Sequence, residues 1–323
     1  MKALSLALAV TVAGVVGVAT QSATAANVKI TPLGSHVGEF CRLDRALIFE
    51  DPDGTRILYD AGRTVAGPDD ARLGNIDAVL LSHVHGDHLG DRHIGAVNEG
   101  TCGKPEFPTV AAPNSNSVNI VMAKNAKFIV GGEMASFFST KIKSLGGDPK
   151  LVQLVRFGAM RKVGGVSVAS VPAVHSNGLN PAFLEHEHAD ALKASGLTAY
   201  VGPPGGYVLT FSNGLAVYLS GDTGITAEQD LVVRRHYKAN LVVLNIGGTF
   251  TTGPTEAAYV INDLVKPASV IASHANEEAT KGGKIVAGTR TEIFKNAVTV
   301  PVHVPLSGIA MEFDGGGTCV AGC

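Results

Sequence analysis

Short apolar runs separated by turn residues begin the chain after Asn27. Three of them, Val28–Pro32, Ala46–Phe49 and Arg56–Tyr59, have the length of β-strands. Asp51-Pro-Asp-Gly54 lies between the second and the third, and such a cluster is typical of a hairpin turn. The pattern therefore predicts neighbouring antiparallel strands at the start of the fold.

Farther along the chain, helical patterns alternate with strand-like runs. Residues 119–127, 134–145, 227–236 and 254 to about 265 have helical patterns, and Pro254 suits the first turn of the last one. Apolar runs predict strands over residues 78–81, 128–130, 151–155, 166–171, 207–211, 215–219, 241–246, 270–272, 298–304 and 309–313. Since no internal repeat or linker divides this series, we expect a single α/β domain over residues 26–323.

The first 25 residues have the pattern of a secretory signal peptide. Lys2 precedes an apolar run over residues 3–20, and Ala23-Thr24-Ala25 is a small-x-small cleavage signal. The alternative is a membrane anchor, but the run is short, rich in Ala and interrupted by Gly. We therefore expect a periplasmic or secreted protein with no stable membrane insertion after cleavage.

The charge of the chain argues against polyanionic partners. Lys and Arg number 26 against 28 Asp and Glu, a formal net charge of −2 at pH 7. No basic stripe marks a nucleic-acid surface, and no polybasic patch marks a membrane surface. The expected partner is a small-molecule substrate, and the sequence is silent on the oligomeric state.

Four cysteines, an even number in a chain predicted to be exported, are compatible with two disulfides. They allow three pairings. Cys319 and Cys323 flank Val-Ala-Gly, a loop that can close on itself, and this leaves Cys41 with Cys102. The alternative is a thiolate metal site, but the spacings do not match a Cys-x-x-Cys knuckle.

The strand predicted over residues 78–81 leads into a dense set of metal-ligand side chains, His83-Val-His85-Gly-Asp87-His88. His83 and His85 are two residues apart, so on an extended segment both point to the same side. Imidazole binds Zn, Fe, Ni and Cu, and a carboxylate adds affinity for Zn or Mn. The motif therefore predicts a metal site at the end of a buried strand.

Three other predicted strands also end in a potential ligand. His175 follows the strand 166–171, Asp222 lies in Ser220-Gly-Asp-Thr-Gly224, and His274 follows the strand 270–272. Side chains at the same end of neighbouring strands converge, so five histidines and two carboxylates can hold two metals. Asp222 is suited to bridge them, because a carboxylate has two oxygens. No Gly-x-Ser-x-Gly nucleophile motif competes with this interpretation.

These motifs resemble the metallo-β-lactamase-fold hydrolase superfamily, and Asp60-Ala-Gly62 matches its Asp-x-Gly signature. The segment 246–257 is similar to the ascorbate-phosphate-lactonase-like branch, although Ile271-Ala-Ser-His274 departs from that branch before the last ligand. The resemblance covers residues 28–313 and implies a four-layer αββα sandwich with the site at one edge of two sheets. It also implies that His83, His85 and His175 hold one metal, Asp87, His88 and His274 a second, and that Asp222 bridges the two.

The resulting hypothesis is an exported hydrolase with two divalent metal ions, Zn being favoured over Mn or Fe. A metal-bridging hydroxide would attack a lactone, ester, amide or phosphoester, with Asp87 and Asp222 orienting it and passing its proton to the leaving group. Two alternatives remain open. One is a mononuclear iron oxidoreductase resembling the persulfide dioxygenases, and the other is a non-catalytic periplasmic metal- or ligand-binding protein on the same fold.

The segment 176–206 is long, irregular and rich in Gly, Pro and charged residues. Because it follows a ligand histidine, it predicts a lid over the site, with a surface insertion as the alternative. His186 and His188 on this segment are predicted to touch substrate, with a solvated patch as the alternative. The resemblance adds His36, after Gly34-Ser35, as a further residue in contact with substrate or close to the site, because that branch has an early Gly-His near its site.

Overall fold

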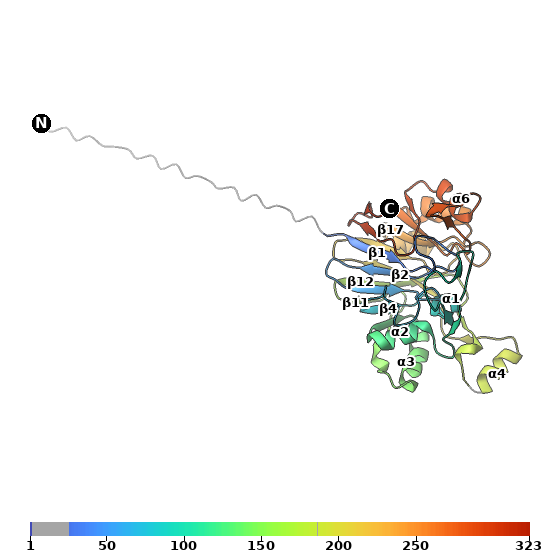
Figure 1. The fold of residues 1–323 in the computed structure, drawn as a ribbon. Helices are drawn as coiled ribbons and strands as arrows, with labels where there is room; N and C mark the ends of the chain where they lie inside the picture. Colours follow the sequence, from blue (N-terminus) through green and yellow to red (C-terminus); the bar gives the residue numbers. More distant parts are fainter. Residues whose placement is uncertain (2–25, 186) are drawn as a thin grey trace.

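The computed structural model describes Met1, residues 26–185 and residues 187–323, and it is built around two β-sheets packed face to face (Figure 1). Most of the predicted signal peptide, residues 2–25, and the predicted substrate contact His186 lie outside the described residues. Within the described part of the chain, no helix is long and apolar enough to cross a membrane.

The first sheet has eight strands and is mixed. In spatial order its strands are β10 (Val152–Leu154), β9 (Lys127–Val130), β4 (Ala78–Leu80), β3 (Arg56–Tyr59), β2 (Leu47–Glu50), β1 (Val28–Pro32), β22 (Met311–Phe313) and β23 (Cys319–Ala321). Neighbouring strands are parallel in one half of this sheet, which contains β3, β4, β9 and β10. They are antiparallel in the other half, which contains β3, β2, β1, β22 and β23. The hairpin predicted at Asp51–Gly54 therefore joins β2 to β3, as expected.

The second sheet has seven strands and is also mixed. In spatial order its strands are β11 (Met160–Val163), β12 (Val166–Pro172), β15 (Gly205–Thr210), β16 (Ala216–Leu219), β17 (Leu241–Asn245), β18 (Ser269–Ser273) and β21 (Val302–His303). The pairs from β11 to β16 are antiparallel and those from β16 to β21 are parallel. As a result β12, β16, β17 and β18 all run in the same direction.

Alternation along the strands builds one apolar layer between the sheets and one on each outer face. Ile57 and Tyr59 of β3 point into the layer between the sheets, while Leu58 points outward. On β17, Leu241 points inward and Val242 outward. Each sheet is therefore apolar on both faces and requires a covering layer of helices.

Helices cover both outer faces. On the first sheet lie α2 (Asn116–Lys124), whose N-cap Ser115 accepts a hydrogen bond from the amide of Val118, and α3 (Met134–Ser144). On the second sheet lie η3 (Gln229–Arg234), α5 (Pro254–Tyr259), η4 (Val260–Val265) and α6 (Arg290–Ala297). The four layers confirm the predicted αββα sandwich.

Short elements fill the connections. They are α1 (Gly86–Leu89), β5 (Arg92–His93), β6 (Gly100–Thr101), β7 (Lys104–Pro105), β8 (Thr109–Val110), η1 (Pro149–Leu151), β13 (Gly178–Leu179), η2 (Pro181–Phe183), α4 (Glu187–Ala194), β14 (Ala199–Tyr200), β19 (Thr280–Lys281) and β20 (Lys284–Ile285). The sequence pattern predicted neither α6 nor β11. The helix expected over residues 227–236 is present as the shorter π-helical segment η3.

The segment 176–206 leaves the body of the protein and returns to it, and α4 projects outward (Figure 1). Its two ends meet at Asn177. The side-chain oxygen of Asn177 accepts a hydrogen bond from the Val84 amide at 2.9 Å, and its amide nitrogen donates to the Gly202 carbonyl at 2.9 Å. One side chain therefore links the entry and the exit of this segment to the histidine loop.

Two disulfides join the predicted pairs, Cys41 with Cys102 and Cys319 with Cys323. The first is buried, with Cα atoms 4.7 Å apart across 61 residues of sequence. The second closes the C-terminal loop on β23. The predicted pairing is therefore confirmed.

Tyr207 of β15 connects the second sheet to the loop that carries the histidines. Its hydroxyl group donates to the carbonyl of Leu81 at 2.7 Å and lies 3.2 Å from the carbonyl of Ile129. The side chain is almost completely buried between the sheets. This contact fixes the end of β4 two residues before His83.

We predict that Tyr207→Phe lowers the free energy of unfolding by about 1–2 kcal/mol, because the buried carbonyl of Leu81 loses its donor. Urea denaturation followed by circular dichroism measures the change. Tyr259→Phe is the matched control, because the Tyr259 side chain is 46% exposed. Equal stability of the two variants would show that the Tyr207 hydroxyl does not support this loop.

Candidate metal centre

The predicted ligands converge at one edge of the sandwich, because each follows a strand that ends there. His83 and His85 follow β4 of the first sheet, and α1 then carries Asp87 and His88. His175, Asp222 and His274 follow β12, β16 and β18 of the second sheet. Since these three strands run in the same direction, their C-terminal ends place the three side chains on the same side.

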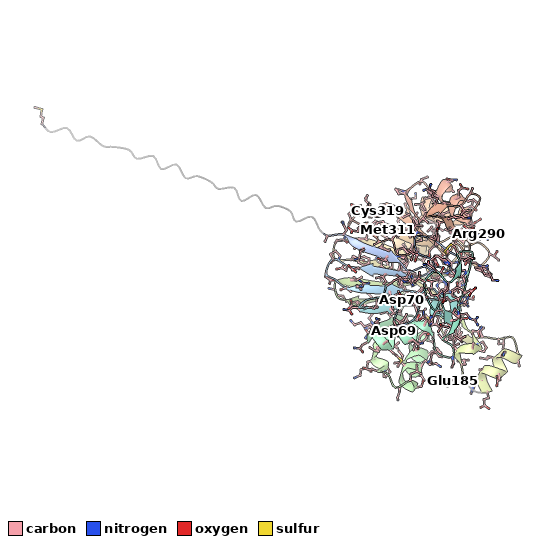
Figure 2. The ribbon with its side chains drawn as sticks, viewed as in Figure 1. Asp69, Asp70, Glu185, Arg290, Met311 and Cys319 are labelled. Atoms are coloured by element: carbon pink, nitrogen blue, oxygen red, sulfur yellow. A yellow bond between two sulfur atoms is a disulfide. The ribbon has the colours of Figure 1, made fainter. Side chains whose placement is uncertain are left out.

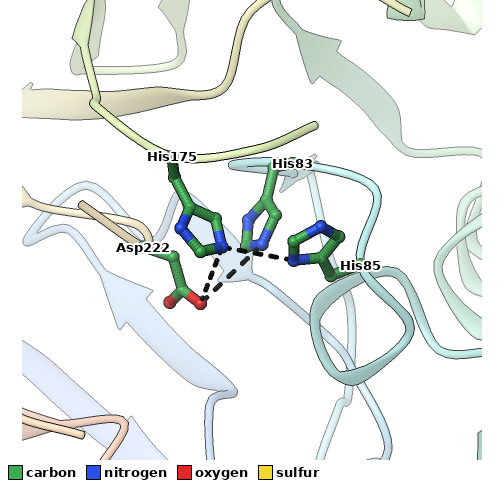
Figure 3. A group of neighbouring side chains, drawn as sticks. All are labelled: His83, His85, His175 and Asp222. Carbon is green, nitrogen blue, oxygen red and sulfur yellow. Dashed lines mark hydrogen bonds and ion pairs between the residues drawn. The ribbon is translucent and has the colours of Figure 1, made fainter. Parts of the chain in front are cut away.

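The first group of side chains contains His83, His85, His175 and Asp222 (Figure 3). Each offers one ligand atom, and these atoms all lie within 4.8 Å of one another. Nε2 of His175 is 3.3 Å from Nδ1 of His85 and 3.7 Å from Oδ2 of Asp222. Nε2 of His83 is 3.8 Å from the same oxygen of Asp222. This spacing allows all four atoms to contact one metal ion.

The second group contains Asp87, His88 and His274, whose ligand atoms also lie within 4.8 Å of one another. Oδ2 of Asp87 is 3.5 Å from Nε2 of His274 and 3.7 Å from Nε2 of His88. Two imidazoles and a carboxylate in this arrangement can hold a second ion.

Asp222 lies between the two groups. Its Oδ1 atom is 3.2 Å from Nε2 of His88, and its Oδ2 atom is 2.9 Å from Nε2 of His274. Both of these nitrogen atoms belong to the second group. Oδ2 of Asp222 is also close to His83 and His175 of the first group. Asp222 is therefore within reach of ions bound at either group.

Several buried polar atoms in this cluster have no hydrogen-bond partner. They include Nε2 of His83, and also Nε2 of His88 and Oδ1 of Asp222, which lie 3.2 Å apart without making a hydrogen bond. Buried polar atoms of a folded protein are normally paired, because an unpaired one loses its hydration without compensation. Lone pairs of imidazole nitrogen and carboxylate oxygen that converge in this way fit a divalent metal ion.

The electrostatics of the cluster favour the protonation states that bind metals. Burial lowers the pKa of His83 well below its usual value, and the nearby His88 lowers it further. Burial raises the pKa of Asp222, but attraction to His88 and His274 outweighs this effect and holds the pKa well below the usual value. For Asp87, burial is likewise outweighed by His88 and by a hydrogen bond from His274. Neutral imidazole and ionised carboxylate are the forms that metals require.

His88 differs because carboxylates surround it. Burial lowers its pKa, but Asp222, Asp87 and Asp60 together raise it to about 10. Positive charge close to His88 offsets the negative charge of these carboxylates. The same position is therefore one where a cation is electrostatically favoured.

Asp60 contacts the second group directly, whereas in the sequence it was noted only as part of the Asp-x-Gly motif. Its Oδ2 atom is 2.7 Å from Nδ1 of His88, and its carboxylate accepts from the Ser82 amide at 2.8 Å and hydroxyl at 2.7 Å. A carboxylate at Nδ1 fixes the imidazole so that Nε2 faces the second group. The neighbouring Gly62 has φ +53° and packs against the Asp87 carbonyl, which leaves no room for a Cβ atom.

Arg45 and Asn276 also support the second group, and the sequence pattern did not indicate either of them. Nη2 of Arg45 lies 3.0 Å from Oδ2 of Asp87 and 2.6 Å from Oδ1 of Asn276. The Arg45 side chain is only 2% exposed. These contacts join residues 42 and 231 positions apart, a separation that no local pattern can reveal.

A cavity of about 430 Å³ opens beside the cluster. The residues that line it are Arg42, Leu43, Arg63, His85, Asp87, His175, Ser176, Asp222, Gly247, Thr249, Phe250, His274, Asn276 and Arg290. Two predicted substrate contacts, His36 and His188, are not among them. His36 instead lies against Ser35 Oγ and the Gly100 carbonyl, and His188 is exposed on α4. Of the predicted lid, Ser176 lines the cavity.

Comparison with known proteins agrees with this geometry. A model of the beta-lactamase superfamily domain matches residues 55–275. A protein of Polynucleobacter asymbioticus named UPF0173 metal-dependent hydrolase is 32% identical over 245 residues, which cover 72% of each chain.

Solved structures share the fold at low sequence identity. The metallo hydrolase Igni18 of Ignicoccus hospitalis superposes with a TM-score of 0.58 at 21% identity, covering 89% of this chain and 99% of its own. The di-iron β-hydroxylase CmlA of Streptomyces venezuelae gives 0.54 at 12% identity, covering 91% and 55%. At these identities the structures support the fold alone. The family model over residues 55–275 and the relative at 32% identity establish that the chain belongs to the beta-lactamase superfamily and, within it, to the UPF0173 family of metal-dependent hydrolases.

Proposed function

We propose that this protein hydrolyses a small molecule with two divalent metal ions bound in the cluster. His83, His85 and His175 would hold the first ion, Asp87, His88 and His274 would hold the second, and Asp222 would contribute to both. The observation that carries the proposal is the position of Asp222, whose two oxygens lie within 3.8 Å of nitrogen atoms from both groups. Zn is the favoured metal for a set of imidazoles and carboxylates, with Mn or Fe as alternatives.

When bound, the ions supply Lewis acidity that polarises a carbonyl or phosphoryl group and lowers the pKa of water. The chain itself contributes orientation and proton transfer. Asp87 and Asp222 both line the cavity, so their oxygens can accept a hydrogen bond from the attacking water and pass its proton to the leaving group. Arg45 holds Asp87 in place through its 3.0 Å contact.

The substrate proposed for this site is a small lactone, ester, amide or phosphoester. A cavity of about 430 Å³ is in the range of small-molecule sites. Each group gathers at least three ligand-type side chains, which favours two metals and hydrolysis over a mononuclear iron oxidoreductase. The open cavity beside the cluster favours an enzyme over a protein that only stores metal.

Export is a second part of the proposal. Lys2, the apolar run over residues 3–20 and the Ala23-Thr24-Ala25 signal support it at the level of sequence. Two disulfides support it independently, because disulfides persist mainly in oxidising compartments.

We predict that Asp222→Asn lowers the hydrolytic rate by about 100-fold or more and reduces the occupancy of at least one metal, because the charge shared by both ions is lost. Elemental analysis measures the metals, and a panel of lactone, β-lactam and phosphodiester substrates measures turnover. Asp69→Asn, on the exposed surface, is the matched control. If Asp222→Asn keeps two tightly bound metals and parental turnover, the proposal that Asp222 contributes to both ions is refuted.

We predict that Asp60→Asn weakens metal affinity by about 10- to 100-fold, because His88 loses the carboxylate that orients it. Asp60 has φ +42°, a backbone conformation that Asn adopts readily, so the fold is expected to persist. Competition with a chromophoric chelator measures the affinity, and circular dichroism checks the fold. Unchanged affinity in the folded variant would show that the Asp60–His88 contact does not support binding.

We predict that protein isolated from its native compartment lacks residues 1–25 and begins at Ala26. Intact-mass spectrometry measures this directly. A mass that still includes Met1 would contradict the proposed export with cleavage.

A further inference from the structure

Building on the proposed hydrolytic function, we infer that the substrate carries an anionic group, a carboxylate or a phosphate, that does not react and is bound by Arg42 and Arg290. Three arginines line the cavity, whereas Asp87 and Asp222 are the acidic residues that line it within the described chain. The inference depends on which of the three guanidinium groups remain available to a ligand.

Arg63 is already engaged. Its Nε and Nη2 atoms bind the two carboxylate oxygens of Asp91 at 2.7 and 2.9 Å, a bidentate pair that satisfies both the charge and the geometry of the guanidinium group. Arg45, behind the cavity, is similarly bound to Asp87 and buried. Neither arginine is therefore free to bind an anion in the cavity.

Arg42 is available. Its side chain is exposed, and in the part of the chain that the structure describes no ion pair or hydrogen bond engages its guanidinium group. Its backbone is nevertheless fixed, because its amide donates to the Cys102 carbonyl at 3.1 Å beside the Cys41–Cys102 disulfide. The fixed backbone keeps this exposed side chain at the wall of the cavity, where its guanidinium group can reach a bound ligand.

Arg290, labelled in Figure 2, is the first residue of α6 and is also largely available. Its Nη1 atom is engaged, because it pairs with Oε2 of Glu277 at 3.6 Å and donates to the Ala275 carbonyl at 3.4 Å, so Nε and Nη2 are the atoms left for a ligand. That carboxylate already accepts hydrogen bonds from the backbone amides of Arg290 and Thr291. On the other side of the guanidinium group, a Cβ atom on Gly248 would lie 3.2 Å from Nε, so glycine at this position leaves space for Arg290 at the cavity wall.

The charge of the loaded centre adds to the effect of the two arginines. The five histidine ligands are neutral when bound to metal, and the two carboxylates carry two negative charges against four positive charges on two divalent ions. The centre therefore has an excess of positive charge, and the available guanidinium groups stand on the same cavity. Guanidinium binds carboxylate and phosphate in a planar, bidentate geometry, which makes these two groups the expected ligands.

The test compares ligands with one and two anionic groups. Calorimetry on the metal-loaded protein measures the dissociation constants of succinate, glutarate and adipate and of the monocarboxylates butyrate, valerate and hexanoate. We expect the best dicarboxylate to bind at least about tenfold more tightly than its monocarboxylate, because a charge-assisted hydrogen bond contributes that much. In Arg42→Gln and Arg290→Gln this ratio should fall towards one, while the exposed control Arg92→Gln should keep it. 3-Phosphonopropionate, tested against succinate, distinguishes a preference for a phosphate-like group from one for a carboxylate.

Each outcome decides the inference. A parent protein that binds both ligand classes equally, or that binds neither, would overturn it, and so would arginine variants that keep the parental ratio. Metal content and turnover of neutral substrates, measured on the same samples, test the proposed function separately. Two bound metals with turnover but no preference for dicarboxylates would leave the hydrolase standing and refute the anionic group. Protein without metal would refute the proposed centre whatever the ratio.

Discussion

The structure depends on the burial of a carboxylate, Asp222, between two sheets. Its side chain is only 4% exposed, and one of its oxygens has no hydrogen-bond partner. A buried carboxylate costs several kcal/mol unless positive charge or strong donors compensate it. The ends of three strands, β4, β12 and β18, surround Asp222 with imidazoles, and these can bind either protons or metal ions. The sandwich therefore provides a rigid frame in which positive charge at this edge stabilises the folded state.

Four of the eight described non-glycine residues with positive φ angles lie around the same edge. Leu43, Asp60, His274 and Asn276 all have positive φ angles, a conformation that side chains other than glycine rarely adopt. Each of them either lines the cavity or contacts a side chain of the cluster. Such conformations persist where the surrounding packing determines them, and they gather at functional sites. At these four positions the surrounding packing, rather than the conformational preference of the residue itself, determines the backbone conformation.

Much of this arrangement could be predicted from the sequence because its signals are local. The histidines follow a short apolar run, and His175, Asp222 and His274 each follow another, so the strand ends alone indicated convergence. The supporting contacts could not be predicted in this way, because Asp60–His88 and Arg45–Asp87 join residues 28 and 42 positions apart. Helix α6 was missed because it is short and polar, and its first amides bind Glu277, which lies on a different segment. His188 was selected by residue type within the predicted lid and His36 by its resemblance to a family motif, and neither of these determines whether a side chain faces the cavity.

The hydrogen bonds of Asn177 have a consequence for how members of this family can diverge. The Asn177 side chain hydrogen-bonds both to Val84 in the histidine loop and to Gly202 near the end of the 176–206 segment. The base of this segment is therefore fixed to the body of the protein independently of the residues between the two ends. Leu184 and Ala199 pack against the core and Glu185 pairs with Lys141, but from residue 187 to residue 198 no described residue is buried. Insertions, deletions or exchange of this outer portion therefore leave the ligand geometry unchanged, and evolution can vary it independently of the catalytic edge. The same property makes it a natural position for grafting new recognition elements onto the scaffold.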